Sequence, residues 1–186
     1  MALPPSLRAS VTPPELEMIA SQQLITVLPS ISMDKTVFIS GTYGPLVPMR
    51  RCQLPLWMAI NLKRKRKCRI IPPDWLTIES LQSHLTNETT QPEFSDLPFR
   101  FAEISKVLLD VAPDDLENPD RLRSLLKDIR EARQAKSREG LDQLDHNELT
   151  LLNLCSMEIN EIRPFFIRSM DVLTKLQPVK GPAADL

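Results

Sequence analysis

The sequence predicts an α+β protein, in which a small β-rich N-terminal module precedes an all-helical module of about four or five helices. Two observations lead to this prediction. Up to residue 72, apolar residues fall in short runs that are rich in β-branched side chains and separated by turns, as is typical of strands. Beyond residue 73 they recur every three or four positions, which is the period of an amphipathic helix. We expect a β-rich module over 1–72, a helical domain over 73–178 and a flexible tail over 179–186.

The β-rich module should contain one short helix and several strands. Residues 12–15, Thr-Pro-Pro-Glu, predict a helix start with a capping box and proline in the first turn. Residues 24–28 and 35–40 predict a pair of strands, and 49–54 predicts a further one. Residues 41–48 hold two of the 4 glycines and two prolines, so they predict a loop.

The junction between the modules contains both tryptophans. Residues 56–62 are apolar almost all round and predict a short buried helix. The basic run 63–67 follows, and then a short strand over 68–71, which two prolines end. Trp57 and Trp75 flank the basic run. We expect both side chains to be largely buried and to fix the β-rich module against the helical one.

The helical module shows a repeated pattern of caps, apolar stripes and breaks. Its helices are expected over 77–85, 98–111, 119–139, 149–160 and 164–176. Residues 86–93 are polar and predict a loop, Gly140 should end the long helix, and 145–148 offers a second capping box. Pro164 begins or kinks the last helix.

Composition argues for an intracellular protein. The formal net charge is −1, so the chain as a whole has no attraction for nucleic acid or acidic membranes. Its 3 cysteines are widely spaced, unlike a secreted disulfide framework. We see no apolar leader typical of a signal peptide and no apolar run long enough to span a bilayer.

The residues that catalysis requires are scarce. The 2 histidines, His84 and His146, lie in polar stretches, and the cysteines lie in apolar settings where a thiol is usually inert. No metal-ligand spacing and no glycine-rich phosphate loop occurs. The acidic pair Asp114-Asp115 is better explained by helix caps and dipole partners. We therefore expect no enzyme, no cofactor, no metal and no small-molecule substrate.

The basic run is the feature that could carry function directly. It is either a DNA-phosphate contact or a nuclear import signal, or else a solvated helix end whose cations complement the helix dipole. No aromatic residue interleaves with it, as a single-strand binding groove would require. Nearby acidic partners are also absent from the sequence, so we expect the run to be dispensable for folding and for assembly with partners. The possible DNA contacts are Lys63, Arg64, Lys65, Arg66 and Lys67.

The last two predicted helices are apolar on several faces. A helix of a small domain buries one stripe on its own core, so the excess predicts a second burial surface supplied by another protein. The alternative is that either helix lies at the centre of the core. The partner-interface candidates are Leu151, Leu154, Phe165, Phe166 and Met170. On the charged face of the long helix, replacing Arg130 and Lys136 by alanine should do little.

Several motifs together resemble the GINS family. They are Tyr-Gly-Pro at 43–45, Leu-Pro-Leu-Trp-Met-Ala-Ile-Asn-Leu-Lys at 54–63, Lys-Cys-Arg-Ile-Ile-Pro-Pro-Asp-Trp-Leu at 67–76, and a late block at 151–164 with Met-Glu-Ile-Asn at 157–160. The resemblance covers about residues 12 to 178, although the basic run is more basic than the family pattern.

This resemblance implies a non-enzymatic scaffold subunit of a four-protein complex, with three other GINS subunits as partners. Each member has a helical domain and a small β-rich domain. The complex would bind the Mcm motor and a helicase cofactor and form the active replicative helicase in the nucleus. The alternative is a stand-alone DNA-binding module that uses 63–69.

Overall fold

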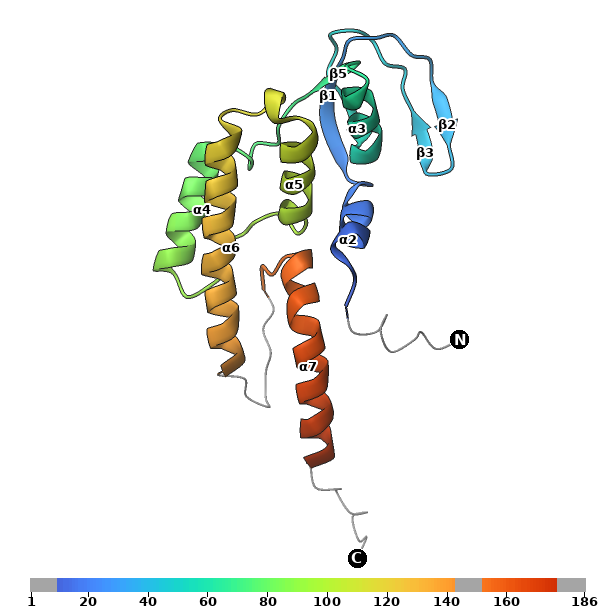
Figure 1. The fold of residues 1–186 in the computed structure, drawn as a ribbon. Coiled ribbons are helices and arrows are strands. Elements are labelled where there is room, and N and C mark those ends of the chain that lie inside the picture. Colours follow the sequence, from blue (N-terminus) through green and yellow to red (C-terminus); the bar gives the residue numbers. More distant parts are fainter. Residues whose placement is uncertain (1–9, 143–151, 177–186) are drawn as a thin grey trace, which may run out of the picture.

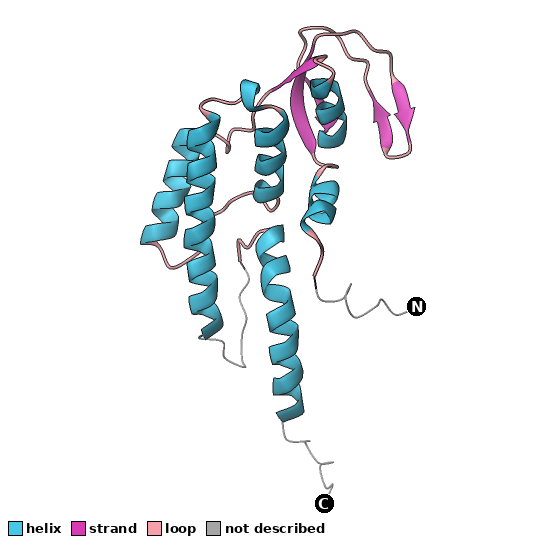
Figure 2. Cartoon of the chain, viewed as in Figure 1, coloured by secondary structure: helices cyan, strands magenta, loops and turns pink. Residues whose placement is uncertain are grey.

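The computed structural model describes residues 10–142 and 152–176. Its N-terminal elements are helix α2 (Pro13–Ala20), strands β1 (Leu24–Pro29), β2 (Thr36–Phe38), β3 (Gly41–Tyr43) and β4 (Cys52–Pro55), helix α3 (Leu56–Arg64) and strand β5 (Cys68–Ile70). Its C-terminal elements are α4 (Ile78–Thr90), α5 (Phe101–Val111), the 3-10 helix η1 (Pro113–Asp115), α6 (Pro119–Asp142) and α7 (Ser156–Leu176). The predicted α+β class, with the β-rich part first, is confirmed (Figure 2).

The central sheet is antiparallel, with β1 between β4 and β5. Val27 of β1 lies opposite Cys52 on one side and Ile70 on the other. Ile25 and Val27 are buried while their neighbours are more exposed, as expected for a strand with one face on a core. Helix α3 contacts all three strands.

The predicted pairing of 24–28 with 35–40 is wrong. Strand β2 pairs instead with β3, which lies in the segment 41–48 that the sequence predicts as a loop. Only two residues separate Phe38 from Gly41, and such a short link favours pairing between adjacent strands. Gly41 has φ of 144°, which side chains rarely allow. The resulting hairpin stands out from the sheet (Figure 1).

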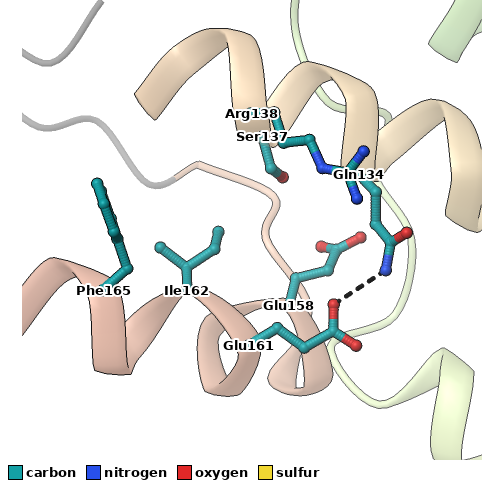
Figure 3. Close-up of a pocket in the computed structure, with 7 residues that line it drawn as sticks. All are labelled: Gln134, Ser137, Arg138, Glu158, Glu161, Ile162 and Phe165. Carbon is teal, nitrogen blue, oxygen red and sulfur yellow. Dashed lines mark hydrogen bonds between the residues drawn. The ribbon is translucent and has the colours of Figure 1, made fainter. Parts of the chain in front are cut away.

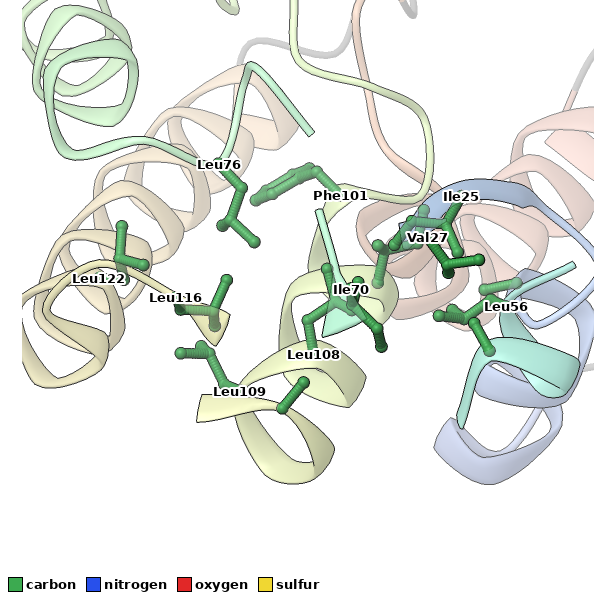
Figure 4. Close-up of a cluster of buried hydrophobic side chains, with 14 of the residues drawn as sticks. Ile25, Val27, Leu56, Ile70, Leu76, Phe101, Leu108, Leu109, Leu116 and Leu122 are labelled. Carbon is green, nitrogen blue, oxygen red and sulfur yellow. The ribbon is translucent and has the colours of Figure 1, made fainter. Parts of the chain in front are cut away.

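The sheet and the helices share one apolar core. Its buried members in the sheet region include Ile25, Val27 and Leu56, and they belong to the same cluster as Ile104 and Leu108 of α5 (Figure 4). Burying such side chains stabilises the fold by about 1.5–3 kcal/mol each. The β-rich and helical parts are therefore packed together rather than joined only by a linker.

Two predicted boundaries in the helical part are wrong. Helix α4 continues through 86–90, where the sequence predicts a loop, because this segment packs against α6 and buries Glu88, and tertiary packing overrides local polarity. Helix α6 also continues past Gly140 to Asp142, which shows that glycine alone did not end it.

Helix α7 replaces two predicted helices. Residues 152–155 are not helical, and one helix runs from Ser156 through Pro164 to Leu176. The capping box predicted at 145–148 lies outside the described residues. The C-terminal half of α7 extends beyond the ends of the other helices (Figure 1).

Candidate partner surface and the charged clusters that position it

Arg133 of α6 is fully buried, at 0% exposed. The buried face of α6 consists of Leu122, Leu125 and Ile129, and Arg133 takes the next position, four residues on. A charged side chain on this apolar stripe needs a complete set of partners, because an isolated buried charge is costly. Sequence reasoning missed this residue, although its place on the stripe was the signal.

All five N–H groups of the Arg133 guanidinium have acceptors. Nε donates to Glu158 Oε1 at 2.6 Å and Nη2 donates to Glu158 Oε2 at 2.9 Å. Nη1 donates to Glu88 Oε1 at 2.5 Å and to the Ser95 carbonyl at 3.2 Å, and Nη2 also donates to the Asn153 carbonyl at 2.6 Å. A guanidinium has five such donors, so none is left unsatisfied.

The charges in this buried site are balanced. Lys136 Nζ lies 2.6 Å from Glu88 Oε2, so two cations face two carboxylates. Burial would lower the pKa of Arg133, but Glu158 and Glu88 raise it above its ordinary value. Burial would raise the pKa of Glu88, but Lys136, Ser95 and Arg133 together lower it. We call Arg133, Lys136, Glu88 and Glu158 the Arg133 cluster.

The Arg133 cluster connects the start of α7 to the helical bundle. Glu158 also accepts the backbone N–H of Cys155 at 2.9 Å, which caps the first turn of α7. Ser156 N–H donates to the Phe99 carbonyl at 2.8 Å. Asn160 bonds to both backbone groups of Val11 at 2.7 Å. The first two turns of α7 are therefore held in a fixed direction.

The rest of α7 has little cover. From Ile159 onward, no α7 side chain that the structure describes is buried. Phe165 is 53% exposed, Ile167 46% and Val172 55%. Figure 3 shows Ile162 and Phe165 at the edge of an open groove between α6 and α7. A long apolar surface of this kind is typical of a helix that packs against another protein.

The partner-interface candidates from the sequence occupy different environments. Phe165 is exposed and Phe166 is half-buried. Leu154 precedes α7 and is buried, so the chain itself already covers it. Leu151 lies outside the described residues, and so does the side chain of Met170, whose backbone belongs to α7.

The two tryptophans have different neighbours, although both pack against the shared apolar core. Both are half-buried. Trp57 packs edge-on against Phe38 and Tyr43, at centroid distances of 5.4 and 6.2 Å, and so holds the β2–β3 hairpin on α3. Trp75 and Ile104 both line the cavity between the sheet and α5, so Trp75 lies where the two modules meet.

The basic run divides into two parts. Lys63 Nζ lies 2.7 Å from both Asp114 and Asp115, and its side chain is only 11% exposed. Asp115 also accepts the Ile70 N–H at 2.7 Å and lies 3.6 Å from Arg69. The expectation of no acidic partners was therefore wrong for Lys63, and the two aspartates tie η1 to the junction rather than cap a long helix.

The two α6 residues whose replacement was expected to do little, Arg130 and Lys136, are both paired. Lys136 contacts Glu88 as described above, and Arg130 Nη2 lies 2.7 Å from Glu161 of α7. Neither side chain belongs to a purely solvated face. A substitution at Lys136 therefore disturbs a buried carboxylate, contrary to the sequence prediction.

The described residues offer little for catalysis. Burial raises the pKa of the Cys68 thiol to about 11 and that of Cys155 to about 12, so both stay protonated and weakly nucleophilic at neutral pH. Burial also raises the pKa of Cys52. Within the described ranges, no three His, Cys, Asp or Glu side chains could together hold a metal ion. None of the described helices is long and apolar enough to cross a membrane.

Comparisons with known proteins give relatives of one family over most of the chain. Residues 12–71 match the PSF2 N-terminal domain, and 75–177 match the GINS complex protein helical bundle domain. The DNA replication complex GINS protein psf2 of Schizosaccharomyces pombe is 42% identical, over 96% of this chain and 98% of that protein. The Candida albicans protein PSF2 is 44% identical over 95% and 88%, and the human one is 35% identical over 90% and 95%.

Proposed function

This chain belongs to the PSF2 family of GINS complex proteins, and from that premise we propose that it is a non-catalytic scaffold subunit of a heterotetrameric GINS complex in DNA replication. Its partners would be three other GINS subunits. In this proposal 1–72 and 73–178 act as two modules of one scaffold. The chain requires no cofactor and no small-molecule substrate for such a role.

The complex, in this proposal, binds the Mcm motor and a further helicase cofactor. The assembly would be the active replicative helicase in the nucleus, both at initiation and during fork progression. The chain contributes by holding other subunits in place rather than by chemistry.

The uncovered half of α7 is the observation that carries the proposal. Its first turns are fixed by Glu158 and Asn160, while Phe165, Ile167 and Val172 remain exposed. A preorganised helix loses little conformational freedom on binding, which favours tight assembly. The partner that fits this surface is a helix with its own apolar stripe. The central side chains of such an interface could each contribute about 2 kcal/mol or more to the binding free energy.

The test is charge substitution on the exposed face of α7. Because Phe165 is exposed in the isolated chain, Phe165→Glu should leave the fold intact. It should release the chain from its three partners in a pull-down after co-expression, while far-ultraviolet circular dichroism still reports helix. Val172→Glu should have the same effect. The control is Ile39→Glu at the hairpin tip, where an apolar side chain that is even more exposed is replaced.

Two outcomes would contradict this interface. If both α7 variants stay in a stoichiometric complex on a sizing column, α7 is not the partner surface. If only Ile39→Glu releases the chain, the partner binds the hairpin instead.

A further inference from the structure

The turn after α3 is built with an unusual residue. Lys67 N–H donates to the Leu62 carbonyl at 2.9 Å, and Arg66 N–H donates to the Lys63 carbonyl at 2.8 Å. This is the Schellman pattern of helix ends, whose left-handed position is usually glycine. Here that position is Arg66, with φ of 55°. A side chain there is strained, and glycine would relieve the strain.

The charge of Arg66 does not help the fold in any contact that the structure describes. Its side chain is exposed, and no acidic residue in the described ranges pairs with it. Lys63 and Arg64 already supply cations in the last turn of α3, where they complement the helix dipole. A strained residue with an unpaired charge is a reason to look for function at this position.

More exposed cations lie at the same end of the sheet. The Ser30 N–H donates to the Lys67 carbonyl on one side of β1, and the Met49 N–H donates to the Pro29 carbonyl on the other side. Two strand spacings separate these positions, or about 10 Å. Residues 50 and 51 directly follow Met49, so these two exposed arginines lie at the same end of the sheet as the turn, and Arg51 also lines the cavity beside Trp75. We call the resulting set the basic edge: Arg50, Arg51, Arg64, Lys65, Arg66 and Lys67.

The basic edge carries an excess of positive charge, and the end of α3 that bears it is held in place by ion pairs. Lys63 and Arg69 are balanced by Asp114 and Asp115, whereas the six side chains of the edge have no ion pair within the described part of the chain. All six are exposed. The ion pairs of Lys63 also hold the end of α3 in place beneath the turn. The whole chain has a net charge of −1, so this concentration is local.

We propose that the basic edge binds the phosphate backbone of duplex DNA without reading its sequence. Arginine suits phosphate because its planar donors match phosphate oxygens, and four of the six residues are arginines. No member of the edge is aromatic, so stacking on single-stranded bases is not available to it. A protein partner is less suited, because the core of a protein interface is depleted in charged residues and all six side chains of the edge are charged.

The experiment measures DNA binding by the assembled four-subunit complex. The probe is a fluorescent duplex of random sequence, titrated at several salt concentrations. Arg64→Gln/Lys65→Gln/Arg66→Gln should weaken binding about tenfold or more at low salt and reduce the salt slope by about 2–3, since each lost phosphate contact removes about 0.9. Arg50→Gln/Arg51→Gln should act in the same direction. The matched control, Lys35→Gln/Arg121→Gln/Lys127→Gln, removes equal charge elsewhere and should change binding less than twofold.

A single variant separates binding from folding. Arg66→Gly removes the charge and the backbone strain together, so it should weaken DNA binding while the melting temperature stays equal or rises. Unchanged DNA binding in the edge variants would overturn the proposal, and so would an equal loss in the control. If the edge variants lose binding to a poly-glutamate peptide and keep duplex binding, the edge serves an acidic protein segment and the proposal is wrong.

Discussion

Arginine occupies two opposite environments in this chain, the Arg133 cluster and the basic edge. Arg133 is buried, and each of its five N–H groups has an acceptor. Arg66 is exposed and strained, without a described ion-pair partner. The basic run is conspicuous in the sequence, whereas Arg133 is a single charge in an ordinary helix. The comparison teaches that a cluster of charge in sequence says little about its contribution to folding.

Replacing Arg133 should lower the free energy of unfolding more than any other single substitution in the chain that we propose. Arg133→Met keeps most of the side-chain volume but leaves Glu88 and Glu158 buried without their main counter-charge. Breaking a buried pair in this way costs about 3–5 kcal/mol. Urea denaturation followed by circular dichroism measures the loss in the free energy of unfolding. Arg133→Met combined with Glu88→Gln and Glu158→Gln should recover part of it, because fewer charges stay unpaired. A single variant as stable as the original chain would show that solvent reaches the cluster.

Two neighbouring cations on α6 sharpen the comparison. Lys136→Ala leaves one oxygen of the buried Glu88 carboxylate without its cationic partner. This should lower the free energy of unfolding by about 1–3 kcal/mol. Arg130→Ala removes a pair whose side chains are 51% and 36% exposed, so its cost should stay within about 1 kcal/mol. If the two substitutions lowered the free energy of unfolding equally, burial of the partner carboxylate would not be what determines the cost.

The same pair of variants predicts a pH dependence. The pKa of Glu88 is lowered in the folded chain, with Lys136 as the leading favourable partner. A lowered folded pKa stabilises the fold above the unfolded pKa, near 4.5, and this stability disappears as pH falls toward the folded value. Lys136→Ala should therefore reduce the loss of stability that occurs as pH falls below about 4.5. Arg130→Ala should leave that part of the stability curve unchanged.

Periodicity in the sequence predicted most helices and the buried strands. Leu122, Leu125 and Ile129 follow helical spacing, and Ile25 and Val27 alternate with more exposed neighbours. These patterns predict the structure correctly because the local geometry of a helix or strand alone decides which side chains share a face. The class and order of the parts were predictable for this reason.

Long-range pairing was not predictable from the same patterns. Glu88 lies in a segment that the sequence predicts as a loop, and its burial depends on Arg133 and Lys136, which follow it by 45 and 48 residues. Lys63 finds its aspartates about fifty positions later in the chain. Trp57 meets a hairpin whose pairing was itself wrongly predicted. Each error comes from a partner that tertiary structure brings close and spacing cannot reveal.

The smallest stability effect is expected at the basic edge, and it completes the comparison. Arg64→Gln/Lys65→Gln/Arg66→Gln removes three positive charges, against one in Arg133→Met, yet the free energy of unfolding should change by about 0.5 kcal/mol or less, because exposed charges without close partners contribute little. Relief of repulsion among the six cations could even raise it slightly, and this gain should fade with added salt. The measurement is urea denaturation at low and high salt, beside a sizing column for the four-subunit complex. A loss of 2 kcal/mol or failure to assemble would show that these side chains form buried ion pairs in the complex. The distinction between a buried cluster that folds the chain and an exposed one that leaves it unaffected would then be lost.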